Sequence, residues 1–175
     1  MRKFILLYLL LFLNIALSEV KIGYVDSQQI MTQYEGFRMA QVELEKEQKR
    51  LEGDYLILQQ QADSLYQSYQ KQEFMMSEDR KKEKINEITQ KERDLQEFGM
   101  KKLGPQNSEL VQIQNQLMQP ILNTFAQACD NVGKERGFDY ILDAGTGGIL
   151  FALESNNITE EVLEEMNKLS TTTDN

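Results

Sequence analysis

Apolar side chains between residues 44 and 69 recur at alternating steps of three and four residues. The positions on this first stripe, which has one polar member, are Leu44, Gln48, Leu51, Tyr55, Leu58, Ala62, Leu65 and Tyr69. Such spacing is that of the two core positions of a heptad repeat, so it predicts an α-helix that packs in a coiled coil. No other feature of the sequence is as specific.

A second, less regular apolar stripe follows. Its members are Ile85, Ile88, Leu95, Phe98, Leu103, Leu110, Ile113 and Leu117. If the chain reverses near Met76 and Ser77, antiparallel partners have residue numbers with a constant sum. In six pairs, from Tyr69 with Ile85 to Leu44 with Leu110, the two residue numbers add to 153 or 154. This agreement favours one antiparallel hairpin over the alternative, a single unbroken helix in a parallel coiled coil.

Short segments with strand composition lie on both sides of the hairpin. The expected elements are strands at Lys21–Val25, Phe138–Leu142 and Ile149–Leu153, a turn at Gly145–Gly148 and a capped amphipathic helix from Thr159. The sequence therefore predicts an α+β fold. Residues 19–35 and 118–175 form a small β-rich body, and residues 36–117 form a coiled-coil hairpin arm inserted into it.

The first eighteen residues have the pattern of a secretory signal peptide. Arg2 and Lys3 precede the apolar run Phe4–Leu13, and Ala16–Ser18 supplies small residues at a cleavage site. The alternative is an uncleaved membrane anchor, but Asn14 interrupts a run shorter than the roughly 20 residues that span a bilayer. We expect residues 1–18 to be removed and the product to be Sec-exported and soluble in a bacterial periplasm.

Composition excludes several classes of function. The 175 residues include no His and one Cys, which excludes His/Cys zinc sites, Ser-His-Asp catalysis and an internal disulfide. The 19 Lys and Arg against 28 Asp and Glu give a net charge of −9, which argues against binding to nucleic acid. No cofactor motif or nucleophile–base pair is present in the sequence, so we expect a protein-binding protein and no enzyme.

Three features resemble chemical sites but have simpler structural interpretations. Gly145–Gly148 lacks the following Lys of a phosphate-binding loop and is interpreted as a strand connection. Asp139 and Asp143 would lie roughly 13 Å apart on a strand, too far for paired acid–base work, so they are expected to be solvated or capping. Cys129 lies among apolar helical residues and is expected to be buried and inert.

The predicted body is too small to form a stable core alone. We expect it to self-associate at the base of the hairpin. The candidate residues for this contact are Ile22, Tyr24, Ile141, Ile149 and Phe151. The alternative is a monomer with a marginal core.

The ordered set of segments resembles the Skp (OmpH-like) family of periplasmic chaperones. The resemblance rests on Lys21–Asp26, the Gln/Glu/Lys-rich hairpin, Gly137–Asp143, Gly148–Phe151 and Ile158–Leu163, and it covers residues 19–169. It implies a jellyfish-like homotrimer in which three hairpins hold unfolded outer-membrane proteins without ATP. The alternative is a structural coiled-coil adaptor or spacer of the cell envelope.

Five apolar residues outside or at the end of the hairpin seam are candidates for binding such clients. They are Tyr66, Phe74, Met75, Met76 and Met100. Met is flexible and polarizable, which suits irregular and exchanging contacts. The alternative for each residue is that it only packs over the helix pair or forms a contact between subunits.

Charge separates this chain from the basic members of the family that it resembles. Residues 35–102 carry 13 basic and 15 acidic side chains. The cations after the turn are Arg80, Lys81, Lys82 and Lys84, and their acidic neighbours are Glu78, Asp79 and Glu83. This balance argues against lipid or lipopolysaccharide binding, so apolar contacts should dominate client capture.

Glycine and proline interrupt both arms at one level. Gly53 on the outgoing helix lies opposite Gly99, Gly104 and Pro105 on the returning helix. An interior Gly costs roughly 1 kcal/mol relative to Ala and a Pro about 3 kcal/mol. We expect a hinge at this level, and the alternative is a kink fixed by packing.

Overall fold

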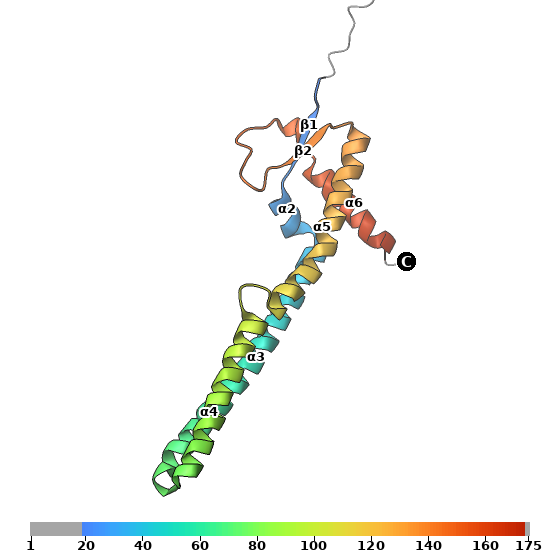
Figure 1. Cartoon of the computed structure of the whole chain (residues 1–175). Helices are drawn as coiled ribbons and strands as arrows, with labels where there is room; N and C mark the ends of the chain where they lie inside the picture. Colours follow the sequence, from blue (N-terminus) through green and yellow to red (C-terminus); the bar gives the residue numbers. More distant parts are fainter. Residues whose placement is uncertain (1–18, 174–175) are drawn as a thin grey trace, which may run out of the picture.

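The computed structural model describes residues 19–173 and shows a small body from which one long helical hairpin projects (Figure 1). The predicted signal peptide, residues 1–18, lies outside the described residues. The elements in chain order are β1 (Ile22–Val25), α2 (Ser27–Gln33), α3 (Glu35–Gln72), η1 (Glu73–Met75), α4 (Glu78–Phe98), η2 (Gly99–Leu103), α5 (Glu109–Arg136), β2 (Tyr140–Asp143), η3 (Glu154–Asn156) and α6 (Thr159–Thr173).

The predicted antiparallel hairpin is present. Helix α3 has 38 residues and is therefore about 57 Å long. The chain reverses in the short η1 helix, and Ser77 then caps α4 by accepting a hydrogen bond from the Arg80 backbone N–H. The rings of Tyr55 and Phe98 lie 6.5 Å apart between their centroids, as the pairing sum predicts. Leu51, on the first stripe, is 1% exposed.

The returning arm is interrupted in the segment where Gly104 and Pro105 are expected to weaken it. Helix α4 continues into the π-helix η2, and residues 104–108, which we name the arm break, then leave the helical path before α5 begins. The fully buried Ser108 hydroxyl donates to the Gly104 carbonyl at 2.6 Å and accepts a hydrogen bond from the Val111 N–H, so it fastens the break and starts α5.

The body is mostly helical, and the prediction of a β-rich body is wrong for the single chain. Strands β1 and β2 form a two-stranded parallel sheet in which Ile22 pairs with Tyr140. Their crossover connection is the whole hairpin, since a parallel pair needs a long link. The predicted strand Ile149–Leu153 is not formed. On the free side of β1, Tyr24 meets Asn157 instead, so this edge offers no ladder to a third strand.

The core of the body forms where α2, α5 and α6 meet the sheet. Its buried side chains are Val25, Ile30, Tyr34, Ala128, Val132, Ile158, Val162 and Met166. Helix α5 contributes to this core at its carboxyl end and to the arm at its amino end (Figure 1). Since α5 runs unbroken through residues 117 and 118, the predicted boundary between arm and body falls inside one helix.

Candidate functional site

The tip of the hairpin presents apolar side chains to solvent. Phe74 is 96% exposed and Met75 is 82% exposed, and both lie in η1, where the chain reverses. Met76, the residue that follows η1, is half-buried. We name these three residues the tip cluster. The structure thus brings three of the five predicted client-binding residues together at one place.

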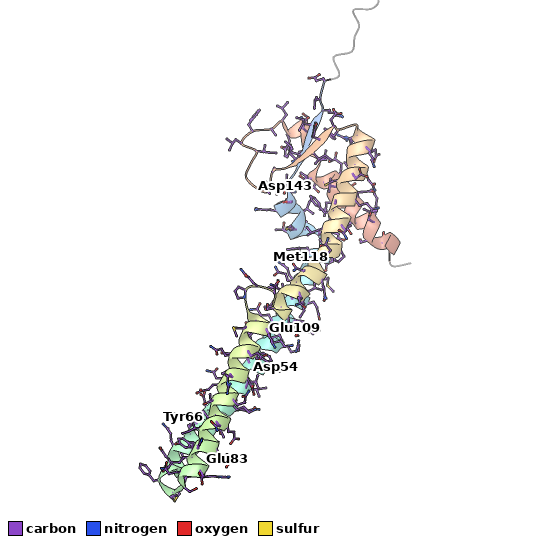
Figure 2. The ribbon with its side chains drawn as sticks, viewed as in Figure 1. Asp54, Tyr66, Glu83, Glu109, Met118 and Asp143 are labelled. Atoms are coloured by element: carbon purple, nitrogen blue, oxygen red, sulfur yellow. The ribbon has the colours of Figure 1, made fainter. Side chains whose placement is uncertain are left out.

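The other two predicted residues lie further up the arm. Tyr66 on the lower half of α3 is 49% exposed (Figure 2), and Met100 in η2 is 63% exposed. Sequence reasoning missed further exposed apolar residues on α3. These are Met39, Val42, Leu56 and Ile57, each more than half exposed. Their positions off the seam were the available signal, since an apolar residue off the seam of a two-helix hairpin has no helix to cover it.

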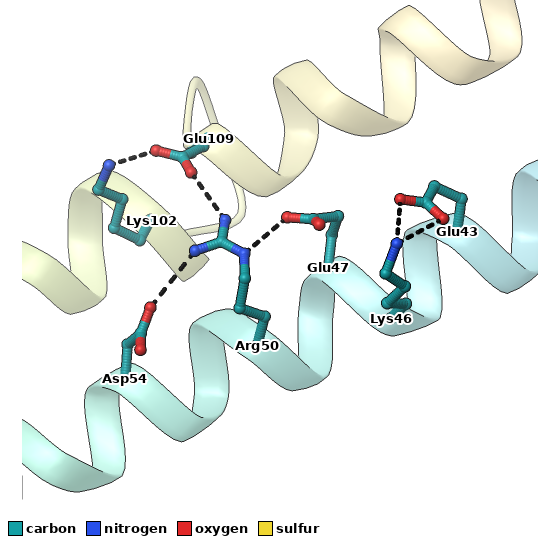
Figure 3. Close-up of polar contacts among 7 residues, drawn as sticks. All are labelled: Glu43, Lys46, Glu47, Arg50, Asp54, Lys102 and Glu109. Atoms are coloured by element: carbon teal, nitrogen blue, oxygen red, sulfur yellow. Dashed lines mark hydrogen bonds and ion pairs between the residues drawn. The ribbon is translucent and has the colours of Figure 1, made fainter.

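An ion cluster joins the segments around the arm break (Figure 3). The Arg50 guanidinium contacts Glu47 at 2.8 Å and Asp54 at 3.3 Å on its own helix, and Glu109 at 3.3 Å on α5. Lys102 donates to the other oxygen of Glu109. The other ion pairs described between residues 43 and 101 link positions three or four apart on one helix. Glu109 is therefore the point at which charge ties the arm segments together.

The same contacts show a change of pairing register. Arg50 and Glu109 have residue numbers that add to 159, whereas the pairs predicted from the stripes add to 153 or 154. The arm break absorbs the difference by leaving the helical path. The structure places Gly104 and Pro105 in this break, Gly99 at the start of η2 and Gly53 inside the unbroken α3. Whether the break acts as a hinge stays a prediction.

The basic residues near the tip are paired with acidic neighbours. Arg80 contacts Glu83 at 2.8 Å, Lys81 contacts Glu78 at 2.8 Å, and Lys84 contacts Glu87 at 2.6 Å. All three pairs lie along α4. The positive charge of these cations is thus largely neutralised by acidic residues of α4 itself, in line with the charge balance of the sequence.

The body exposes a second apolar surface. Its members, which we name the body surface, are Ile22, Tyr140, Leu142, Leu150, Phe151 and Leu153. Leu150 is 97% exposed and Phe151 is 83% exposed. Of the other residues predicted for self-association, Ile149 is half-buried, Tyr24 donates its hydroxyl to Glu154, and Ile141 packs against the core of its own chain. Tyr140 and Leu142 flank Ile141 on β2, and sequence reasoning missed both.

The two aspartates of β2 and its flank have structural roles. Asp143 accepts hydrogen bonds from the Ser27 hydroxyl at 2.7 Å and from the Gly145 N–H at 2.8 Å, so it fastens the glycine loop to the start of α2. Asp139 accepts a hydrogen bond from the Lys21 N–H at 2.8 Å.

Burial, with a smaller effect of Asp143, raises the pKa of the Cys129 thiol to about 11. Cys129 is half-buried and not fully buried as predicted, but the raised pKa makes its thiol a poor nucleophile at neutral pH.

None of the helices among the described residues is long and apolar enough to span a bilayer. A small body with a long projecting hairpin, which exposes apolar side chains at its tip and along α3, defines the class of arm-bearing helical proteins. The sequence model of the OmpH-like outer membrane protein family matches residues 21–166, and the chain belongs to this family. Proteins of this family are periplasmic chaperones and are typically not enzymes.

A solved structure has the same fold. It is the crystal structure of a candidate outer membrane chaperone (OmpH-like) from Caulobacter crescentus CB15. The two proteins are 10% identical, the match covers 87% of this chain and 86% of that chain, and the TM-score is 0.74. No sequence among the curated proteins matches the chain.

Proposed function

We propose that this protein is an ATP-independent periplasmic holdase for unfolded outer-membrane β-barrel proteins. Such clients carry strands whose apolar faces have not yet met lipid and whose unpaired edges invite aggregation. The arm offers apolar contacts to these strands and leaves them unfolded. The observation that carries the proposal is the exposure of the tip cluster and of Tyr66 on a projecting hairpin.

The holdase acts as a homotrimer whose three arms surround the client. The body surface supports this part of the proposal, because Leu150 and Phe151 have no cover in the single chain. The outer edge of β2 also has no neighbouring strand in the described chain. A second copy would cover both features. The segment Ile149–Leu153 could then form a strand by pairing with a strand of that copy.

An aggregation assay tests the proposed function. Residues 19–175, purified without ATP, should suppress the aggregation of several unrelated β-barrel proteins diluted from urea. An envelope adaptor, for which the exposed Phe74 and Met75 could form a docking tip, would act on one partner or on none. Failure with every client would contradict the holdase proposal.

Serine substitutions locate the activity. Changing Tyr66, Phe74, Met75 and Met76 together to Ser should raise the client Kd by at least about tenfold, because each apolar side chain that a client covers contributes on the order of 1 kcal/mol or more. The matched control changes four exposed polar residues of α4 to Ser. These residues, which we name the α4 control set, are Asn86, Thr89, Gln90 and Gln96. Higher salt should have little effect, since the arm carries little net charge. Salt-sensitive binding with a harmless tip substitution would contradict apolar capture.

A further inference from the structure

The lower half of α3 differs chemically from the helix beside it. Residues 55–70 contain one charged residue, Asp63, among sixteen, whereas thirteen of the twenty-one residues of α4 are charged. The two helices lie side by side along the hairpin (Figure 1). The lower part of each arm therefore presents the highly charged α4 beside a nearly uncharged segment of α3, residues 55–70.

A shallow, open groove lies on one face of this nearly uncharged segment of α3. The residues that line it are Ile57, Gln60, Gln61, Ser64, Leu65 and Ser68. In contrast, the groove between Tyr55 and α4 includes the charged side chains of Glu92 and Arg93. The groove on α3, which we name the glutamine groove, combines apolar and uncharged polar groups, and none of its lining residues is charged.

The polar groups of the glutamine groove are exposed and available. Within the described part of the chain, the side chains of Gln60, Gln61 and Ser64 make no hydrogen bond to the protein, and Ser68 accepts one long bond of 3.5 Å from Gln72. Ile57 beside them is 53% exposed. The groove therefore offers donors, acceptors and an apolar surface that the fold itself does not use.

We propose that the glutamine groove binds the backbone of an extended, unpaired strand segment of the client, an inference that rests on the proposed holdase function. A Gln amide donates and accepts hydrogen bonds, so it matches both the N–H and the C=O groups of an unpaired strand. A Lys or Glu side chain matches only one of them. Ile57 and Leu65 contact the apolar side chains of the strand and keep water away from these bonds.

The length of the groove fits such a segment. Residues 57–68 span about 17 Å along α3, which equals an extended segment of about five residues. A membrane strand has roughly 9–11 residues, so one groove covers about half of it. Recognition then depends on an extended backbone and not on a client sequence, which suits a protein that holds many different clients.

Alanine substitution separates backbone hydrogen bonding from apolar contact. The groove variant carries Gln60→Ala, Gln61→Ala, Ser64→Ala and Ser68→Ala, which keep the net charge and favour the helix. We expect its Kd for a β-barrel protein diluted from urea to rise roughly tenfold, because several hydrogen bonds are lost. The α4 control set changed to Ala should alter the Kd less than about twofold. Unchanged or tighter binding by the groove variant would show that apolar area alone holds the client and would overturn the inference.

Photo-crosslinking gives an independent readout in the full mature chain. A benzoylphenylalanine at Gln61 should crosslink the unfolded client, and the same group at Gln90 on α4 should crosslink it much less. Equal crosslinking at both positions would overturn the inference that the glutamine groove binds the client. If the unmodified protein binds no client, the holdase proposal and the groove both fail. If it binds clients but the groove variant binds them equally well, only the groove fails.

Discussion

Two glycines that the sequence analysis treats alike have different surroundings. A Cβ added at Gly53 would meet no atom within 4 Å, whereas one at Gly104 would lie 2.4 Å from the Met100 carbonyl oxygen. Gly53→Ala should therefore stabilise the protein by about 0.5–1 kcal/mol, and Gly104→Ala should destabilise it by about 1–3 kcal/mol. Urea denaturation of both variants checks this, and equal effects would show that the arm break is not packed as described.

Cys129 provides a test of burial at the level of one residue. Its pKa is raised from 9.0 to about 11, so the thiolate, which is the reactive form, is about a hundredfold rarer near neutral pH than in an exposed thiol. Alkylation with iodoacetamide at pH 8 should be correspondingly slow in the folded protein and fast in urea. The rate should rise with pH toward 11. Rapid alkylation of the folded chain would contradict a half-buried thiol with a raised pKa.

At the scale of elements, the sequence predicts the paired part of the arm well. The heptad spacing and the pairing sum predict that Tyr55 packs near Phe98 and that the chain reverses near Ser77, which caps α4. The arm break was visible only as a weak point, Gly104–Pro105, because a sum of residue numbers assumes unbroken helices. The buried hydroxyl of Ser108 and the register change toward Glu109 depend on contacts between segments that no local pattern contains.

The ion cluster at the break predicts a pH dependence. The hydrogen bond from Lys102, with further help from Arg50, lowers the pKa of Glu109 from its ordinary 4.5. A lowered pKa in the folded state stabilises the fold above the unfolded pKa, and this contribution is lost as the pH falls through the folded pKa. Glu109→Gln should therefore lower the melting temperature at neutral pH and have no such effect at about pH 2.

A matched control is available on the same arm. Glu97 pairs with Lys101 inside one helical turn and joins no second segment. Glu97→Gln should lower the melting temperature less than Glu109→Gln does at neutral pH. Equal losses would mean that Glu109 contributes no more than an ordinary pair within one helix.

At the scale of the whole molecule, the exposed segment around Leu150 and Phe151 is the feature that local sequence could not place. Its composition is that of a strand, but within the described chain it pairs with neither β1 nor β2. Because this segment forms no strand in the single chain, the predicted β-rich body is a two-stranded sheet with helices.

The proposed trimer predicts the effect of substitutions in the same segment. The unmodified mature protein should sediment as a trimer at micromolar concentration, and Leu150→Ser with Phe151→Ser should shift it toward monomer. Each large apolar side chain that is covered contributes roughly 1.5–3 kcal/mol. Phe74→Ser with Met75→Ser removes equally exposed apolar groups at the tip and should leave the trimer intact. A folded, stable monomer of the unmodified protein would contradict the trimer.

The two sides of the arm have unequal continuity: α3 runs unbroken past the level at which the returning side leaves the helix. A hinge at this level would therefore have to bend one intact helix, which resists bending as an elastic rod does. Such a rod gains energy as it bends and gives it back as it straightens. An arm pushed outward by a bulky client would recover its shape when the client leaves, so repeated use requires no nucleotide to reset it.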